Sequence, residues 1–497
     1  MSVRPDTTDA AHPVSSRQIL RAGLWGIGLL TLYRVILLAF SQAELFVDEA
    51  QYWLWGQSLE FGYYSKPPLI GWVIRAVTDV AGSDARFWVR LPAPLLHGAT
   101  AWIILLIARR FSAGWGPVLV AMAYLSMPGI AVGALLFSTD TVMLPFYALA
   151  LLLYLDLTGR SSGLRALAMG AALGLGMMAK YAAIYFVLGA GLTALLVPMM
   201  RIARRDALLA ALAFAVVVSP NVWWNVVNGF STVSHTMDNV DWVRDAGAQP
   251  FVPNWSGLAE FVAGQFGFFG PVLFAVWLVL LPVVLRRGTP LQRMFLWFSL
   301  PVVALVCGQA LASRAYANWA APAYVAASLL VVPALMRGGR WRRWVLGLSF
   351  AINGAIALAL PLATTQAQRL SLDGDRLLLS RYVGRADLSE AVFQQAQDAG
   401  LLVIVAQNRD VLADLMYREG GRGLTIYSTP PQGRAMNHYA KSYPLAQTTT
   451  GPVLFVTEGA APTGCDAQLL RRITPERGAY RGRDFGLWQV PAGCLRP

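Results

Sequence analysis

Apolar residues are gathered along this chain into long runs, which are separated by short polar stretches rich in arginine. Each run is about 20 residues long, the length an α-helix needs to cross the hydrocarbon core of a bilayer. The pattern predicts eleven transmembrane helices, over residues 20–40, 89–108, 115–136, 139–158, 164–180, 182–200, 206–225, 258–285, 292–312, 317–336 and 343–363. We therefore expect a polytopic α-helical membrane protein.

The arginines between the runs predict the orientation of the chain. They concentrate in the N-terminal tail (1–19) and in every second loop, near 109–110, 160–165, 201–205, 286–293 and 337–343. The positive-inside rule places these segments in the cytoplasm. The first run resembles a signal peptide but is longer than a usual signal core, so an uncleaved first helix is expected. An odd number of spans then puts the C-terminus on the opposite side.

Three segments are expected outside the cytoplasm. Two are long loops of the transmembrane domain (20–363), over residues 41–88 and 226–257; the third is a C-terminal domain over 364–497. Long loops between packed helices are usually functional. The C-terminal domain has the pattern of a soluble α/β domain, with a helix after Asn408 and strands near 401–406, 424–427, 453–456 and 486–490.

Composition supports the membrane assignment and narrows the chemistry. The chain is 56% hydrophobic and 13% charged, with a formal net charge of +13. A soluble protein carries about a quarter charged residues. The basic residues lie in the positive-inside pattern rather than in a nucleic-acid-binding stripe, and no phosphate-binding glycine loop or zinc spacing is present. Cys465 and Cys494 pair only if their domain faces an oxidising compartment, which the spacing leaves open.

The stretch after the first apolar run carries the strongest chemical signal. Asp48 and Glu49 precede a segment in which Tyr52, Trp55 and Leu59 share one face, as in a helix lying on a membrane surface. The simple interpretation is a capping box, with Asp48 as the cap. The functional interpretation is that the helix dipole keeps Asp48 ionised, so that it can act as a general base at the interface.

A rigid loop follows this segment. It contains Tyr63, Tyr64 and two prolines around a single lysine, Lys66. A lysine beside an aromatic belt is often only an interfacial anchor. The alternative is that Lys66 binds a phosphate, since its ammonium acts as a point charge for that group.

Other ionisable and polar residues gather on the same expected face. Asp140 begins a span, where it is either a helix cap or a second functional acid, and Lys180 ends one. The remaining candidates at outer edges are His235, Arg244, Arg314, Asn318 and Trp319. The positive-inside rule does not explain the acids, so this convergence favours a site on the outer face.

These residues resemble motifs of a known family. Asp48-Glu49 and Gly62-Tyr-Tyr-x-Lys-Pro-Pro68 are similar to the polytopic glycosyltransferases of the protein-mannosyltransferase type, a GT-C fold class that includes the aminoarabinose transferase of lipid A. Further similar motifs are Ser138-Thr-Asp140, Gly174-Leu-Gly-Met-Met-Ala-Lys-Tyr181, Pro220-Asn-Val-Trp-Trp-Asn225, Gly264-Gln-Phe-Gly267 and Ala317-Asn-Trp-Ala-Ala-Pro-Ala323. The resemblance covers residues 20 to about 340.

The resemblance implies transfer of a sugar from a polyprenyl-phosphate carrier to an extracytoplasmic acceptor, with inversion. Asp48 is then the catalytic base, supported by Glu49 and a second acid, Asp140. The carrier phosphate is held by Lys66, with Lys180 at the cavity edge. The family often has an acid before the lysine of the Lys-Pro-Pro loop; Ser65 stands there, which argues against a bound metal.

The remaining assignments follow from this function. Arg244 and Arg314 can help to stabilise the departing phosphate. Tyr52, Tyr63, Tyr64, His235, Asn318 and Trp319 are candidates for the substrate pocket. No cofactor or nucleic acid is expected. The partners are the lipid-linked donor, membrane lipid, and an acceptor that is lipopolysaccharide, another glycan or a protein, and the location is the bacterial inner membrane. A transporter or flippase would need pseudo-symmetric halves, and a non-catalytic scaffold leaves Asp48, Lys66 and Asp140 unexplained.

Overall fold

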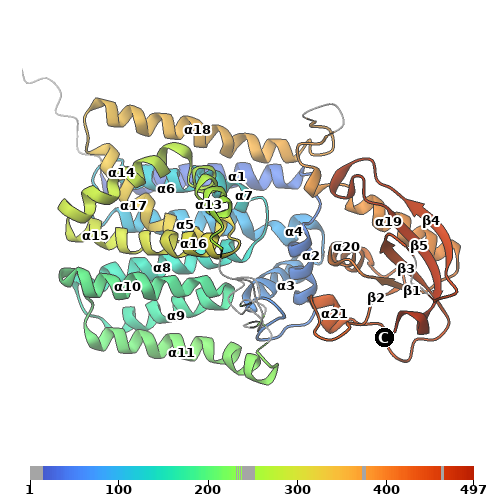
Figure 1. The fold of residues 1–497 in the computed structure, drawn as a ribbon. Coiled ribbons are helices and arrows are strands. Elements are labelled where there is room, and N and C mark those ends of the chain that lie inside the picture. Colours follow the sequence, from blue (N-terminus) through green and yellow to red (C-terminus); the bar gives the residue numbers. More distant parts are fainter. Residues whose placement is uncertain are drawn as a thin grey trace, which may run out of the picture.

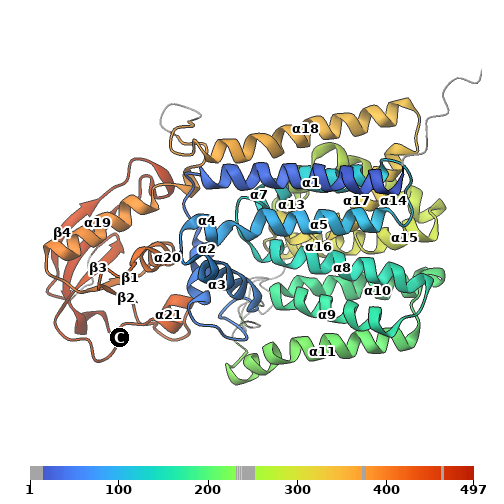
Figure 2. The ribbon, with the colours of Figure 1, turned by 180° about the vertical axis from the view of Figure 1, so that it is seen from behind.

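The computed structural model describes residues 15–230, 252–371, 376–460 and 464–496, together with residues 232, 234 and 237. A bundle of long helices forms one body, and a smaller α/β domain covers one end of the bundle (Figure 1). Figure 2 shows the same two parts from behind, with α1 and α18 side by side along one edge and α11 on the opposite edge. Because the domain covers only one end, the two ends of the bundle differ in what they can bind.

The helices of the bundle follow the apolar runs of the sequence. They are α1 (Ser16–Ala39), α4 (Arg86–Arg90), α5 (Pro92–Ala108), α6 (Gly116–Ser126), α7 (Pro128–Gly133), α8 (Thr139–Gly159), α9 (Gly163–Ala179), α10 (Tyr185–Leu196), α11 (Arg204–Val227), α13 (Trp255–Phe268), α14 (Pro271–Arg287), α15 (Pro290–Trp297), α16 (Leu300–Ala312), α17 (Ala323–Met336) and α18 (Arg340–Thr364). The short 3-10 helices η1 (Tyr181–Ile184), η2 (Pro198–Met200) and η3 (Ala317–Ala320) adjoin them.

Within the described residues, six helices are long and apolar enough to cross a membrane. A bent pair, α13 and α14, makes a seventh if it is one span, and four apolar helices are shorter. Each of the eleven expected runs contains one of these helices or the pair. The protein is therefore a multi-pass membrane protein.

Two of the expected spans are broken rather than continuous. The run 115–136 divides at Pro128, whose ring prevents the preceding residue from staying helical. The run 258–285 bends by 113° between α13 and α14. Gly270 occupies this bend at φ +96°, where a Cβ atom would lie 2.2 Å from the Asn353 side chain. Glycine is thus required there, both by its backbone conformation and by its neighbour.

The first long loop, over residues 41–88, folds over the end of the bundle. It contains α2 (Val47–Gly56) and α3 (Leu69–Ala81), which pack against each other. The aromatic face expected to lie on the membrane is instead buried in protein, so that prediction is wrong. Trp55 is 1% exposed and stacks on Tyr63, while His438 of the C-terminal domain meets its edge. Leu59 lies beyond the end of α2.

The C-terminal domain is a five-stranded mixed sheet with helices. Its elements are α19 (Arg385–Asp398), β1 (Val403–Ala406), α20 (Arg409–Arg418), β2 (Thr425–Ser428), α21 (His438–Ser442), β3 (Pro452–Glu458), β4 (Gln468–Ile473) and β5 (Phe485–Pro491), with the 3-10 helices η4 (Ser380–Tyr382), η5 (Gly478–Tyr480) and η6 (Ala492–Leu495). The strand order is β2-β1-β3-β5-β4, with β1, β2 and β3 parallel and β5 antiparallel to both neighbours. A disulfide joins Cys465 and Cys494.

Four of the five strands and helix α20 were predicted from the sequence. Strand β4 was missed because it is an edge strand whose sequence, Gln-Leu-Leu-Arg-Arg-Ile, has no buried residue and no regular alternation. The central strand β3 is easier to predict from the sequence, because five consecutive residues of it are buried. This is the continuous apolar run typical of a strand that is covered on both sides.

Candidate active site

Polar groups from five distant segments meet at the end of the bundle that faces the C-terminal domain. These segments are α2, the loop before α3, the start of α8, the end of α9 and the start of α20 (Figure 1). The local sequence explains why charge is tolerated there. Each contributing residue lies in the first turn of a helix, at its last residue or in a loop, so its polar head can leave the apolar interior.

Asp140, Lys180 and Asn318 form the best-defined group. The Lys180 ammonium lies 2.7 and 2.8 Å from the two carboxylate oxygens of Asp140. The Asn318 amide donates a third hydrogen bond to Asp140, at 2.8 Å. The cap of α8 is Ser138 and not Asp140, so the simple interpretation of Asp140 as a cap is wrong. The tertiary structure thus brings together three residues that the sequence singled out separately.

Asp48 lies in the first turn of α2 but does not cap it. Glu49 closes the capping box instead, by accepting a hydrogen bond at 2.9 Å from the backbone N–H of Phe46. The Asp48 side chain, 45% exposed, is hydrogen-bonded to Arg409, which also donates to Gln51 at 2.9 Å. Asp48 is therefore half accessible to a substrate and is held by a residue of the C-terminal domain.

Arg409 was not predicted, although it is the first residue of α20. Burial opposes its charge, but the attraction of Asp48 outweighs that effect, and the pKa of Arg409 is raised. The one available signal was its place three residues after a predicted strand, at the start of a predicted helix. Nothing in the sequence indicated that this helix would dock on α2.

Lys66 lies near the same charges, and its ammonium makes no hydrogen bond or ion pair with any residue that the structure describes. Burial lowers its pKa and nearby Lys180 lowers it further, while Asp48, Asp140 and Arg409 also act on it electrostatically. The five charges are therefore close enough to interact. A partly desolvated ammonium without a partner is suited to bind an anion.

The loop that carries Lys66 is fixed at both sides. The ring of Tyr63 stacks on Trp55 at 4.9 Å between centroids, and its hydroxyl donates to the backbone oxygen of Trp55 at 2.8 Å. Tyr64 reaches the C-terminal domain, where its hydroxyl donates to the backbone oxygen of Ala435 at 3.0 Å. Both tyrosines thus hold the loop in place. Tyr52 is 6% exposed, and burial raises its pKa well above the ordinary value.

Glu49 is buried and already paired. Its two oxygens receive hydrogen bonds from Arg90 at 2.8 and 2.6 Å, and one of them also accepts from the backbone N–H of Phe137 at 2.8 Å. Glu49 is 2% exposed and Arg90 is 1% exposed. These contacts connect α2 to the end of α4 and to the segment just before α8. The geometry of Glu49 is that of a group that positions Asp48.

The remaining candidates lie at the edge of the site or outside the described residues. Arg314 is exposed between α16 and η3, and Trp319 lies in η3 with its ring edge-on to Tyr316 at 5.8 Å. His235 and Arg244 fall outside the described residues. Among the residues that the structure does describe, no group of three or more His, Cys, Asp or Glu side chains is arranged to hold a metal ion.

Comparison of the sequence with known proteins places this chain in a family of enzymes. Residues 65–224 match the dolichyl-phosphate-mannose-protein mannosyltransferase family. The chain is also 40% identical to the lipid A galacturonosyltransferase RgtD of Rhizobium johnstonii over 485 residues, which is 96% of this chain and 99% of RgtD. The chain belongs to the RgtD family of glycosyltransferases. The match extends through the C-terminal domain, so Arg409 lies within the shared region.

Two solved structures have the same overall fold as this chain. The structure of ArnT from Cupriavidus metallidurans in the apo state superimposes with a TM-score of 0.66 at 14% identity, covering 95% of this chain and 98% of ArnT. The structure of ArnT bound to undecaprenyl phosphate gives a TM-score of 0.65 at 13% identity, with the same coverage. The chain is thus a multi-pass membrane glycosyltransferase of the GT-C fold, with its C-terminal domain included.

Proposed function

We propose that this chain transfers galacturonate from a polyprenyl-phosphate carrier to lipid A, with inversion at the anomeric carbon. The observation that supports this most directly is the unpaired Lys66 ammonium beside the half-exposed carboxylate of Asp48. One group suits the phosphate of a donor and the other suits the hydroxyl of an acceptor. The sugar and the acceptor are taken from the activity of RgtD, 40% identical over almost the whole chain.

The chemistry needs few groups, because a sugar phosphodiester already carries a good leaving group. The acceptor oxygen forms a bond to the anomeric carbon as the bond from that carbon to the phosphate oxygen breaks. Asp48 takes the proton of the acceptor hydroxyl. The polyprenyl phosphate leaves with the electron pair, and Lys66 stabilises its negative charge. Attack from the face opposite the phosphate gives inversion.

Neighbouring residues orient these two groups. We assign Arg409 and Gln51 to holding the Asp48 carboxylate, and Glu49 with Arg90 to fixing the turn of α2 from which Asp48 projects. Asp140, Lys180 and Asn318 form one hydrogen-bonded group whose net charge stays close to neutral, next to Lys66. The other candidate residues are assigned to the edges of the substrate pocket. Its rim would contain Arg244, Arg314, His235 and Trp319, and its wall Tyr52, Tyr63 and Tyr64.

The proposed location is the inner membrane, with the site on its outer side. The arginine pattern supports a cytoplasmic N-terminus, a transmembrane domain over residues 20–363 and a C-terminal domain over 364–497 outside the cytoplasm. The disulfide of Cys465 and Cys494 fits an oxidising compartment. Donor and acceptor lipids would then both reach the site within the membrane plane.

A transporter is the alternative, and the structure offers it little support. Transporters hold their substrates near the middle of the membrane at broken helices. The broken pair here, α13 and α14, has its charged residues, Glu260, Arg286 and Arg287, away from the bend at Gly270. The interacting charges lie instead at one end of the bundle.

Purified protein in detergent tests the proposal directly. It is incubated with lipid A and polyprenyl phosphates that carry either galacturonate or galactose, and the products are analysed by mass spectrometry. We expect transfer of galacturonate, and little or no transfer of galactose, which lacks only the carboxylate. Equal transfer of both sugars would overturn the choice of sugar. Transfer of neither, by protein that is folded and binds polyprenyl phosphate, would overturn the function.

A further inference from the structure

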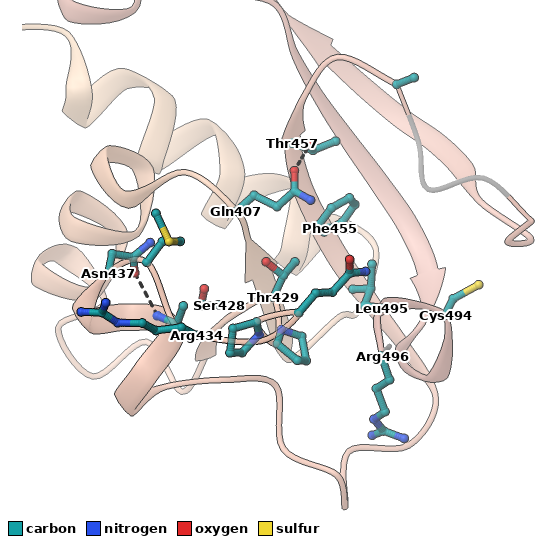
Figure 3. A pocket seen from close by; sticks show the side chains of 16 residues that line it. Gln407, Ser428, Thr429, Arg434, Asn437, Phe455, Thr457, Cys494, Leu495 and Arg496 are labelled. Carbon is teal, nitrogen blue, oxygen red and sulfur yellow. Dashed lines mark hydrogen bonds between the residues drawn. The ribbon is translucent and has the colours of Figure 1, made fainter. Parts of the chain in front are cut away.

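A cavity lies in the C-terminal domain, at the carboxyl ends of its parallel strands. Its volume is about 700 Å³. Its lining includes Gln407, which follows β1, Ser428 and Thr429 at the end of β2, and Thr457 near the end of β3 (Figure 3). The cavity is distinct from the group around Asp48 and Lys66, since no residue of that group lines it.

The topology of the sheet explains why a cavity forms at this point. The chain passes from β1 to β2 on one side and then crosses back to β3 on the other, so β1 is the strand at which the order reverses. The connections that follow the adjacent strands β1 and β3 run to opposite sides of the sheet, to β2 and to β4, which opens a crevice outside their carboxyl ends. Open α/β sheets bind their ligands in this crevice.

The chemistry of the lining indicates the class of ligand. Side-chain amides and hydroxyls predominate among the polar groups, and in Figure 3 the Gln407 oxygen accepts the Thr457 hydroxyl at 2.9 Å. Phe455, Leu495 and a pair of prolines supply apolar surface. None of the described residues that line the cavity is acidic, whereas Arg434 and Arg496 are basic. A hydroxyl-rich ring with an anionic substituent suits this combination, because amides and hydroxyls bind its polar edge and apolar groups its face.

The cavity is connected to the catalytic region by short segments of rigid structure. Gln407 and Arg409 are two positions apart, at most about 7 Å of chain, and Arg409 contacts Asp48. On the other side, Ala435, which lies between lining residues 434 and 436, accepts the Tyr64 hydroxyl of the Lys66 loop. The Lys441 ammonium lies 6.0 Å from the Tyr64 ring. An extended ligand could occupy the cavity and reach Asp48.

We propose that this cavity binds the phosphorylated saccharide head group of the acceptor glycolipid. The inference rests on the proposed function and extends it, because it assigns acceptor recognition to the C-terminal domain. The donor is held by the Lys66 loop, and the acceptor head group is held at the carboxyl ends of β1, β2 and β3. Its hydroxyl is thereby presented to Asp48.

A substitution that fills the cavity provides the test. Thr429→Trp places a large side chain in the cavity, while Thr425→Trp makes the same change at an exposed position of β2 outside the lining. We measure KM for lipid A and, separately, KM for the polyprenyl-phosphate donor, using full-length protein in detergent. Thr429→Trp should raise KM for lipid A at least about tenfold, a loss of about 1.4 kcal/mol, and leave KM for the donor unchanged. Thr425→Trp should change neither.

A smaller change keeps the test informative if Thr429→Trp does not fold. Thr457→Val removes one hydroxyl from β3 and keeps a β-branched side chain, which suits a strand. We expect KM for lipid A to rise about fivefold, because the Gln407 amide loses the one neutral hydrogen bond from Thr457 that orients it in the cavity. In addition, deacylated lipid A, which is the soluble phosphorylated disaccharide, should compete with lipid A for the wild-type protein and compete less well for Thr457→Val.

The outcomes separate this inference from the proposed function. If the wild type transfers sugar to lipid A and KM for lipid A is unchanged in both cavity variants, the acceptor does not bind here. Equal effects of Thr429→Trp and Thr425→Trp, or a parallel rise in KM for the donor, would also overturn the inference. A wild-type protein that transfers no sugar from polyprenyl phosphate would instead overturn the proposed function.

Discussion

At the scale of single residues, Asp48 and Glu49 show how neighbours in sequence acquire different roles. Consecutive residues of an α-helix point about 100° apart, so Glu49 faces the bundle and Asp48 faces the C-terminal domain. Glu49 is buried with Arg90, whereas Asp48 stays 45% exposed. A carboxylate that must accept a proton needs access to the substrate, and only Asp48 has it. Lys66, likewise partly accessible, is unpaired among the described residues.

Asp48→Asn should abolish transfer while the protein still binds its donor. The amide keeps the size and much of the hydrogen bonding of the carboxylate, but it cannot accept the proton of the acceptor hydroxyl. We expect kcat to fall by at least about a hundredfold, with unchanged affinity for polyprenyl phosphate. Asp79→Asn, at an exposed carboxylate on α3, is the matched control and should keep full activity. Wild-type kcat in Asp48→Asn would exclude Asp48 as the base.

Donor affinity should decline at alkaline pH because of Lys66. Burial and nearby Lys180 lower the pKa of Lys66 in the free protein, and a bound phosphate anion favours the ammonium form. The affinity is therefore full below the lowered pKa and is lost as the pH rises through it, earlier than for an ordinary lysine. Lys66→Arg keeps its charge and should bind without this alkaline decline. Identical pH profiles for the two proteins would rule out this role.

Glu49→Gln should destabilise the whole fold rather than the chemistry alone. The substitution leaves the buried Arg90 guanidinium without its carboxylate. Breaking a buried pair in this way costs about 3–5 kcal/mol, which thermal unfolding in detergent will register as a lower melting temperature. Glu390→Gln is the matched control: it breaks an exposed pair with Arg422 and should cost less than about 1 kcal/mol. Equal melting temperatures for the two variants would contradict this account.

At the scale of secondary-structure elements, the contact of α20 with α2 joins the two parts of the protein. It delivers Arg409 to Asp48, and Tyr417 from the same helix donates to the backbone oxygen of Asp84 at 2.8 Å. A second contact is formed by Glu44, which accepts hydrogen bonds from the first two N–H groups of α19, at 2.7 and 3.2 Å. The first long loop therefore caps a helix of the C-terminal domain.

Arg409→Gln should slow transfer without affecting donor affinity. The substitution removes a charge-assisted hydrogen bond to Asp48, worth about 1.5–3 kcal/mol, which corresponds to a loss in kcat of about tenfold to hundredfold. Arg409→Lys retains the positive charge and should recover part of the rate. Arg422→Gln, which changes an arginine in an exposed pair with Glu390, is the control. A purely structural role would make Arg409→Lys as inactive as Arg409→Gln, and that result would exclude our assignment.

At the scale of the whole molecule, the end of the bundle that holds the candidate site is covered by the C-terminal domain (Figure 2). The site is therefore built between two bodies, and its residues come from both. In the proposed function this arrangement separates the two substrates: the lipid-linked donor binds at the Lys66 loop, and the acceptor head group binds in the cavity of the C-terminal domain. Both must lie on the same side of the membrane for the proposed reaction to occur.

Cysteine labelling tests this orientation. Ser58→Cys in the first long loop and Thr425→Cys in the C-terminal domain are exposed positions, and Ser161→Cys lies in an arginine-rich loop at the other end. An impermeant thiol reagent should label the first two variants in cells with a permeabilised outer membrane. Ser161→Cys should react only after the inner membrane is disrupted. Labelling of Ser161→Cys under the first condition, with protection of the other two, would invert the topology.

The sequence by itself determined the apolar helices, most of the strands and most of the candidate residues. These features depend on local periodicity, on the length of a bilayer-spanning helix and on motif chemistry, all of which are properties of contiguous stretches. It also indicated one charged face, because the positive-inside rule does not explain acids at the ends of spans. Asp140, Lys180 and Asn318, each chosen from its own stretch, prove to be hydrogen-bonded to one another.

The tertiary structure alone decided which groups are paired. Arg409 lies 361 residues from Asp48 and Arg90 lies 41 from Glu49, and no local pattern encodes either contact. It also decided that the aromatic face of α2 is buried in protein and does not lie on the membrane surface. The C-terminal domain docks on α2 and shields this face from lipid and water. Side-chain partners depend on how distant elements pack, and packing is a property of the whole chain rather than of any segment.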